Sequence, residues 1–290
     1  MGTIIDGRRT SAEIKDEIKV KVDSLKEKGQ RVPHLAIIIV GDDAPSHTYV
    51  NGKVNACKAV GFEYTLLTFA NSLTEEKLLK HVTKLNEDDD IDGFIVQIPL
   101  PDHISVEHVT DTILPSKDVD GFTNRNFGSI VANHHLLLPA TPFGVMELIK
   151  RYEIETLGKE CVVVGASRLV GAPLSLMLLQ DGKATVTVCH EHTKDLAKHT
   201  READIVISAV GKPNLITKEM VKEGVVVIDV GTSRVEDSSK KSGFRLSGDV
   251  DYENVAPIAS YITPVPGGVG PMTIASLLVN TLKAYEARNL

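Results

Sequence analysis

Three polar residues fall at helical spacing in the first third of the chain. Ser46, Tyr49 and Lys53 stand at i, i+3 and i+7, so a helix would present a hydroxyl, a phenol and an amine on one face. An apolar run ending at Val40 precedes this helix, which puts that face near the end of a strand. Such a face can transfer protons. The alternative is a surface helix whose polar groups are incidental.

A carboxamide and two carboxylates form a second set. Gln97 ends an apolar strand pattern, the position where α/β sheets bind ligands, and both ends of its amide need partners. Asp118 and Asp120 share the turn Lys117-Asp118-Val119-Asp120-Gly121-Phe122. Turn formation or capping is the alternative interpretation of these carboxylates, and it can hold for Asp118.

The stretch Gly165-Ala166-Ser167-Arg168-Leu169-Val170-Gly171 follows the apolar run Cys161-Val162-Val163-Val164. A β-branched run that breaks into glycine and resumes as an apolar helix indicates strand, tight turn and helix. In that geometry, backbone N–H groups and a helix N-terminus bind a pyrophosphate. The glycines are six residues apart, so the motif is not G-x-G-x-x-G. An ordinary strand-to-helix turn is the alternative.

Length, composition and charge narrow the class of protein. A chain of 290 residues predicts two domains. A net charge of −7 argues against nucleic acid or an anionic membrane surface as the main partner. No apolar run approaches a membrane span, and the first residues lack a signal-peptide core. Cys57, Cys161 and Cys189 are odd in number and widely spaced, which predicts reduced core residues, no metal site and a cytoplasmic protein.

Both halves of the chain alternate helical and strand patterns. In the first half, helices are predicted over residues 11–28, 46–60 and 74–85, and strands over 35–40, 62–69 and 93–96. In the second half, strands are predicted over 161–164, 184–189, 205–209 and 225–230, and helices over 172–179, 195–200 and 218–222. This alternation predicts βαβ units, mostly parallel sheets and a Rossmann-like second half.

The remaining segments connect or follow these patterns. The two halves join near residues 139–142, and a helix over 143–152 follows. Residues 237–243 are polar and lysine-rich, which predicts a solvated hairpin or loop. Residues 262–273 are rich in proline and glycine, which indicates backbone held close to a ligand. A final apolar helix is predicted over residues 273–287.

Together these segments resemble the bifunctional methylenetetrahydrofolate dehydrogenase/methenyltetrahydrofolate cyclohydrolase family. The resemblance covers nearly the whole chain. It rests on blocks in the family's order: Ile5-Asp6-Gly7, Ser46…Tyr49-Val50…Lys53, Val96-Gln97-Ile98-Pro99-Leu100-Pro101, 117–122, Thr141-Pro142, Val227-Ile228-Asp229-Val230-Gly231, Gly248-Asp249-Val250 and 263–273.

The resemblance implies two α/β domains flanking a cleft, with a Rossmann-type dinucleotide-binding domain at the C-terminal side. Residues 1–142 would form the folate-binding catalytic domain, with the helix 271–290 packing back on it. Residues 143–270 would bind NAD(P). Such proteins are generally homodimers. The chain would oxidise 5,10-methylenetetrahydrofolate to the methenyl form with NAD(P)+, then hydrolyse that product to 10-formyltetrahydrofolate.

The resemblance also implies residue roles. Lys53 becomes the principal catalytic residue and Gln97 its partner, while Tyr49 stacks on the aminobenzoate and Asp120 anchors the pterin. A lysine near the methenyl cation and partly desolvated can be neutral enough to assist water. The implied substrate-binding residues are Ser46, Tyr49, Val50, Asn51, Gly52, Lys53, Val96, Gln97, Ile98, Asp120, Pro266, Gly267, Gly268, Val269 and Gly270. The implied cofactor-binding residues are Gly165, Ala166, Ser167, Arg168, Glu191, Gly211 and Thr232.

The cofactor positions depart from the family pattern. Ala166 stands where relatives often carry an arginine that holds the 2′-phosphate of NADP, and Glu191 stands where a second phosphate contact often lies. A carboxylate there suits a ribose hydroxyl and repels a phosphate. Arg168 and His192 can form a substitute phosphate site. The family favours NADP, whereas these residues favour NAD.

Two alternatives remain. A monofunctional NAD-dependent methylenetetrahydrofolate dehydrogenase would lack the hydrolytic step, and the set Tyr49, Lys53 and Gln97 argues against it. A non-catalytic protein on the same fold would be expected to lose Lys53, Gln97 or Asp120, and all three are present.

Overall fold

The apolar run near residue 35 forms the central strand of a parallel sheet. In the computed structural model, which describes residues 2–240 and 243–289, β2 (His34–Val40) lies between β3 (Glu63–Phe69) and β4 (Gly93–Val96). Every residue of β2 after His34 is buried, as expected for a parallel strand covered on both faces. The three strands predicted for the first half are therefore confirmed.

The helices around this sheet begin at side-chain caps. The Asp43 carboxylate accepts the Ser46 N–H at the start of α2 (Ala44–Val60), which ends at Gly61 in the left-handed region. Thr74 caps α3 (Glu75–Glu87). The short helices α4 (Val106–Thr112) and α5 (Asn124–Val131), which the sequence patterns did not predict, begin after the hydroxyl caps Ser105 and Thr123. These helices carry or flank the polar residues that the sequence singled out in the first half of the chain.

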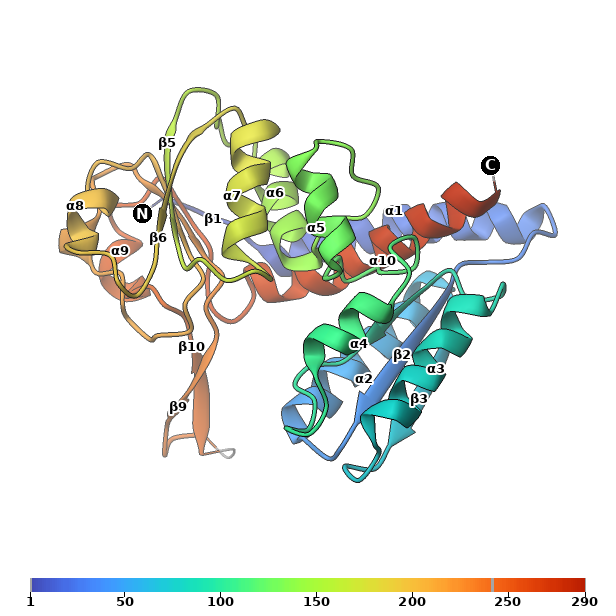
Figure 1. Ribbon diagram of the computed structural model, residues 1–290. Helices are drawn as coiled ribbons and strands as arrows, with labels where there is room; N and C mark the ends of the chain where they lie inside the picture. Colours follow the sequence, from blue (N-terminus) through green and yellow to red (C-terminus); the bar gives the residue numbers. More distant parts are fainter. Residues whose placement is uncertain (1, 241–242, 290) are drawn as a thin grey trace. The chain divides into compact units, whose positions relative to one another are not determined.

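The chain divides into two compact units (Figure 1). We name the units by the roles that the sequence resemblance implies: residues 12–140 and 274–290 form the catalytic unit, and residues 1–11 and 141–273 form the dinucleotide unit. The long helices α1 (Gly7–Glu27) and α10 (Val269–Asn289) each contribute residues to both units. Within the catalytic unit, Asn280 of α10 donates its amide N–H groups to the carbonyls of Val119 and Leu138, at 2.8 and 2.7 Å. These bonds fasten the final helix to the loop that carries Asp120.

The dinucleotide unit contains a second parallel sheet. Among the described residues it has six strands, in the order β1-β11-β8-β7-β5-β6. Their bounds are β1 (Thr3–Ile4), β5 (Glu160–Val164), β6 (Thr185–Cys189), β7 (Ile205–Ser208), β8 (Val226–Asp229) and β11 (Tyr261–Ile262). Figure 1 shows α6 (Ala140–Arg151) and α7 (Gly171–Gln180) on one face, and α8 (Leu196–Thr200) and α9 (Tyr252–Val255) on the other. The predicted Rossmann-like second half is confirmed.

The strand order of this sheet reverses direction beside β5. The chain passes from β5 to β6 on one side, then returns to β7 on the other side of β5. Helices on the two faces therefore diverge at this point, and the carboxyl ends of β5 and β7 border the crevice between them. This is the position at which open α/β sheets bind their ligands.

Three parts of the fold differ from the structure expected from the sequence or add to it. Residues 1–11, expected in the catalytic domain, belong to the dinucleotide unit because β1 pairs with β11. The helix predicted over 218–222 is only a 3-10 turn, η1 (Lys218–Met220), since the chain is already extended at Val221. Residues 237–243 join β9 (Ser233–Glu236) to β10 (Phe244–Ser247), which confirms a hairpin, although residues 241–242 lie outside the described residues.

The three cysteines are free thiols in the core. Burial raises the pKa of Cys57 and of Cys161 to about 12 and also raises the pKa of Cys189. The predicted core positions of the three cysteines are therefore confirmed. In residues 2–240 and 243–289, no helix is long and apolar enough to cross a bilayer, and no three potential metal ligands gather.

Candidate functional site

A lysine and a carboxamide meet in the catalytic unit. Lys53 on α2 donates from Nζ to Oε1 of Gln97, at 3.0 Å, just beyond the end of β4. The amide of Gln97 donates its own N–H to the carbonyl of Ile98, at 2.6 Å, so its oxygen is directed at the lysine. Lys53 is only 8% exposed. The pair predicted from the sequence is thus a fixed, largely desolvated amine that can exchange a proton with a bound molecule.

Asp120 lies close enough to Lys53 for the two charges to interact. It borders a small pocket whose walls include Val96, Ile98 and Phe122. Burial raises the pKa of the Asp120 carboxyl, the Lys53 charge opposes this rise, and the Asp118 charge adds to it. No hydrogen bond from a described residue reaches either carboxylate oxygen of Asp120. Because Asp120 is partly exposed and its carboxylate makes no hydrogen bond to a described residue, it is available to bind a ligand.

Asp118, two residues earlier, has a structural role. Its carboxylate accepts the backbone N–H groups of Gly121, Phe122 and Thr123, at 2.8 to 3.1 Å, and an amide N–H of Asn126. These bonds shape the turn that presents Asp120. The turn-forming interpretation allowed from the sequence is therefore correct for Asp118 and does not describe Asp120.

The remaining polar residues of α2 differ in their surroundings. Tyr49 lies one turn before Lys53 and is 52% exposed, so its ring is open to stacking. Ser46 is buried, and its hydroxyl donates to the Asp43 carboxylate at 2.6 Å, which commits that proton to the helix cap. Val50 and Val96 have buried side chains and belong to the core.

Three further predicted substrate residues lie beside this group. Asn51 is exposed on α2, Gly52 is partly exposed, and Ile98 is partly exposed after Gln97. A Cβ atom at Gly52 would lie 3.3 Å from Ile274 of α10, so the glycine permits close packing of the two helices. The catalytic unit therefore brings Tyr49, Lys53, Gln97 and Asp120 together around exposed surface of α2.

The Gly165 turn lies at the reversal point of the larger sheet. Gly165 has a φ of 112°, and a side chain there would collide with the carbonyl of Ala209, which follows β7. A side chain on Gly171, the first residue of α7, would collide with the Gly165 carbonyl. Val170 precedes α7 without a side-chain cap, but the Ala172 N–H donates to the Ser167 carbonyl at 3.0 Å and Pro173 has no N–H, so the N–H of Gly171 is the donor left in the first turn. This geometry fits a pyrophosphate against the backbone.

The other predicted cofactor residues lie at the same edge of the sheet. Ala166, Ser167 and Arg168 are exposed in the turn after β5. Glu191 follows β6, is 85% exposed in its side chain, and lies 3.5 Å from Nε2 of His192. Gly211 follows β7 with a φ of 78°, and the exposed Thr232 follows β8. All seven predicted cofactor residues thus follow the carboxyl ends of adjacent parallel strands.

Packing explains some of the glycines in the proline- and glycine-rich segment, residues 262–273. Gly267 has a φ of 113° and accepts the Arg8 N–H at 3.1 Å, while a side chain on Gly7 would collide with the Gly268 carbonyl. These glycines let the segment pack against the N-terminal strand and helix. Gly268 and Val269 are buried, whereas Pro266 and Gly270 are exposed. Their contact with folate stays a prediction.

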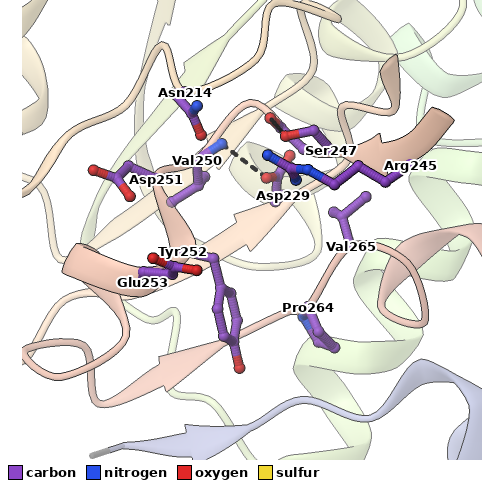
Figure 2. Close-up of a pocket in the computed structure, with 11 residues that line it drawn as sticks. Asn214, Asp229, Arg245, Ser247, Val250, Asp251, Tyr252, Glu253, Pro264 and Val265 are labelled. Carbon is purple, nitrogen blue, oxygen red and sulfur yellow. Dashed lines mark hydrogen bonds between the residues drawn. The ribbon is translucent and has the colours of Figure 1, made fainter. Parts of the chain in front are cut away.

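Two buried carboxylates, to which the sequence analysis gave no role, lie next to the loops that carry the predicted cofactor residues. Asp229 ends β8 and accepts the Val250 N–H at 2.9 Å, the bond drawn in Figure 2. Asp249 accepts hydrogen bonds from residues that follow β7. Both lie in quoted sequence blocks, 227–231 and 248–250. The signals that could have found them are a charged residue directly after the apolar run 225–228, for Asp229, and a charged residue between a glycine and a valine, for Asp249.

Family models match both units of the chain. Residues 5–120 match the tetrahydrofolate dehydrogenase/cyclohydrolase catalytic domain, and residues 139–289 match the NAD(P)-binding domain of the same proteins. The fold and site thus define a folate-converting, dinucleotide-dependent class of enzyme. The chain belongs to the tetrahydrofolate dehydrogenase/cyclohydrolase family, as the sequence resemblance predicted.

Curated relatives match along almost the whole chain. The bifunctional protein FolD of Cytophaga hutchinsonii is 54% identical over 284 residues, which is 97% of this chain and 98% of that protein. The bifunctional protein FolD of Bacteroides thetaiotaomicron is 55% identical over 285 residues, 97% of each chain.

Solved structures agree with the fold. The bifunctional enzyme FolD from Campylobacter jejuni has a TM-score of 0.94 at 48% identity, covering 99% of this chain and 100% of that one. The Trypanosoma brucei enzyme, solved with NADP cofactor and an inhibitor, has a TM-score of 0.95 at 39% identity, covering 99% and 98%. The NAD-dependent dehydrogenase from Saccharomyces cerevisiae is 21% identical and shares the fold.

Proposed function

We propose that this chain oxidises 5,10-methylenetetrahydrofolate with a nicotinamide dinucleotide and then hydrolyses the methenyl product to 10-formyltetrahydrofolate. The observation that carries the proposal is the hydrogen bond between the buried Lys53 and the partly exposed Gln97, near a carboxylate of Asp120 that accepts no hydrogen bond from a described residue. An amine, a carboxamide and a carboxylate are the groups that proton transfer and pterin recognition require. Full-length similarity to bifunctional relatives supports both reactions.

Lys53 acts on the hydrolytic step. Water attacks the one-carbon bridge of the methenyl cation and loses a proton as it does so. The bond from that carbon to N5 then breaks, and the proton of the new hydroxyl passes to N5, which leaves the formyl group on N10. The Lys53 amine in its neutral form accepts that proton, and the Gln97 oxygen, 3.0 Å away, holds the amine in place. Tyr49, exposed one turn earlier, offers its ring to the aminobenzoate portion of the substrate.

The dinucleotide, when bound, accepts the hydride from the one-carbon bridge. The residues that would hold it are those of the Gly165 turn and the loops that carry Glu191, Gly211 and Thr232. Gly165 and Gly171 keep side chains away from the backbone that faces the pyrophosphate. At the start of α7, the N–H of Gly171 and the positive end of the helix dipole would be available to the phosphate oxygens.

We infer that NADP is used and that NAD is also accepted. The NADP complex of the Trypanosoma brucei relative supports NADP. The exposed Ala166 supplies no charge to a 2′-phosphate, and the exposed Glu191 repels one, so discrimination against NAD is expected to be small. Arg168, exposed in the same turn, and His192, beside Glu191, are the residues that could form a substitute phosphate contact.

Two further parts of the proposal concern the whole molecule. A homodimer in the cytoplasm agrees with the family resemblance and with the three reduced, buried thiols. The monofunctional alternative is not favoured, because an NAD-dependent dehydrogenase without the hydrolytic step has no evident need for a buried lysine fixed by a carboxamide.

Replacing Asp120 with asparagine tests the substrate part of this proposal. We expect the dissociation constant for tetrahydrofolate to rise about tenfold, because a charged acceptor for the pterin is lost. The raised carboxyl pKa means that Asp120 contributes most stability below its unfolded-state pKa and loses it as pH rises through the folded-state value. The neutral variant should therefore be at least as stable as the parent at pH 7, measured by denaturant unfolding.

Asp118→Asn is the matched control for this experiment. Asp118 holds three backbone N–H groups, so its replacement should lower the free energy of unfolding by about 1–3 kcal/mol. An Asp120→Asn protein that binds folate like the parent would refute the pterin role. Loss of stability in Asp120→Asn, with unchanged affinity, would assign Asp120 to the turn instead.

A further inference from the structure

The loop that follows β7 is fastened by one buried carboxylate. Asp249 is fully buried, and its Oδ2 atom accepts the Ser208 hydroxyl at 2.9 Å and the Val210 N–H at 2.7 Å. Its Oδ1 atom accepts the Lys212 N–H at 2.8 Å. The carboxylate therefore spans the segment on both sides of Gly211, the residue expected to face the dinucleotide.

A second buried carboxylate fixes the first. Oδ1 of Asp229 accepts the N–H groups of Asp249 and Gly231, both at 3.0 Å, and Oδ2 accepts the Val250 N–H at 2.9 Å (Figure 2). The N–H of Asp229 donates to the Thr263 hydroxyl at 2.7 Å. Asp229 thus holds both the backbone of Asp249 and the turn that leads to Thr232.

Glycine is required on both sides of this arrangement. A Cβ atom at Gly231 would collide with the Asp249 carboxylate, and one at Gly248 would collide with Oδ2 of Asp229. Two turns therefore approach the carboxylates so closely that no side chain fits between them. The turns Val230-Gly231 and Gly248-Asp249 are therefore packed directly against each other.

The electrostatic cost of this arrangement is not offset by a cation. Among the described residues, no basic side chain lies within ion-pair distance of either carboxylate. Burial raises the pKa of Asp229 to about 7, and the Asp249 charge adds to this rise, against the opposing N–H donors. Burying two neighbouring carboxylates on backbone donors is costly, and it fixes the backbone positions that donate to them.

We propose that Asp249, supported by Asp229, is a positioning residue for dinucleotide binding. It sets the backbone of Val210, Gly211 and Lys212 beside the Gly165 turn, where the Ala209 carbonyl already closes on Gly165. The Gly211 carbonyl is fixed in turn by the Ser233 hydroxyl, at 2.8 Å. This inference rests on the proposed use of a dinucleotide by this unit.

The test is the Asp249→Asn variant of the full chain, with Asp251→Asn as the matched control. The asparagine side chain keeps the shape but cannot accept the Lys212 N–H and the Val210 N–H together. We expect the dissociation constant for NADP, measured by calorimetry, to rise about tenfold or more. Hydrolysis of methenyltetrahydrofolate without dinucleotide should stay within about twofold of the parent, because its residues lie in the catalytic unit. Asp251 bonds the Asn254 side chain and should leave both values unchanged.

A fall in the hydrolysis rate as large as the loss of NADP affinity, or an unchanged affinity for NADP, would overturn the proposal. Hydrogen exchange of the Val210 and Lys212 amides tests the positioning role of Asp249 independently of the proposed function. Faster exchange is expected in Asp249→Asn even if the parent binds no dinucleotide, and unchanged exchange would refute the positioning role. If Asp249→Asn does not fold, Ser208→Ala removes one donor to the same carboxylate and should raise the dissociation constant about threefold; no change there would also refute it.

Discussion

Lys53→Ala is expected to lower the rate of methenyltetrahydrofolate hydrolysis by about 10²–10⁴-fold, the range typical of a lost general base. Lys53 is the residue of α2 whose amine is buried and held by a carboxamide, at 3.0 Å from Gln97. Alanine removes the proton acceptor and leaves Gln97 without its partner. The affinity for NADP should be unchanged, because the expected dinucleotide residues belong to the other unit.

Lys58→Ala is the control for this substitution. Lys58 lies on the same helix but is exposed, and its amine lies over the Tyr64 ring at 5.4 Å. Its replacement tests whether removing any lysine from α2 lowers the hydrolysis rate through a change in helix stability or surface charge. Hydrolysis by Lys53→Ala at the parental rate would remove Lys53 from the mechanism, and an equal loss in Lys58→Ala would make the effect non-specific.

The double variant Ala166→Arg/Glu191→Ser is expected to raise the efficiency with NADP relative to NAD by about tenfold. A guanidinium adds a charge-assisted contact to the 2′-phosphate, and serine removes a like charge. Both positions are exposed, so solvent screening limits the gain. The change should appear in the Michaelis constant for NADP rather than in kcat, because the 2′-phosphate is remote from the hydride.

Ionic strength separates this electrostatic effect from a structural one. The gain in the double variant should shrink at high salt, since exposed charges are screened over about 8–10 Å at ordinary ionic strength. Initial rates with NAD and NADP, for parent and variant at two salt concentrations, measure it. An unchanged NADP/NAD ratio would mean that Arg168 or His192 already supplies the phosphate contact, and our interpretation of Glu191 would be wrong.

The alternating pattern predicted the three strands of the smaller sheet and four strands of the larger one, β5 to β8. Leu35 to Val40 and Val162 to Val164 are continuous apolar runs because their strands are buried on both faces. The short helices α4 and α5 were missed, since seven or eight residues give too few turns for a clear stripe. The placement of residues 1–11 was also missed, because a two-residue strand is recognised only through its pairing with β11.

In the candidate site too, features set by spacing along the chain were predicted, and features set by contacts in the folded structure were not. Helical spacing aligned Tyr49 with Lys53, and strand position placed Gln97 within reach of the lysine. Spacing could not show that the Ser46 hydroxyl is committed to Asp43, because that depends on the cap geometry. The pairing of Asp229 with Asp249 depends on a contact between residues 20 positions apart, which no local pattern reports.

The most direct test of the account is the product balance of the unmodified protein. Methylenetetrahydrofolate and NADP are supplied, and reduced dinucleotide, methenyltetrahydrofolate and 10-formyltetrahydrofolate are followed together. The account predicts that 10-formyltetrahydrofolate forms faster than the uncatalysed hydrolysis allows, with methenyltetrahydrofolate below the amount of reduced dinucleotide. Accumulation of methenyltetrahydrofolate mole for mole with reduced dinucleotide, and its decay at the rate seen in buffer alone, would contradict it.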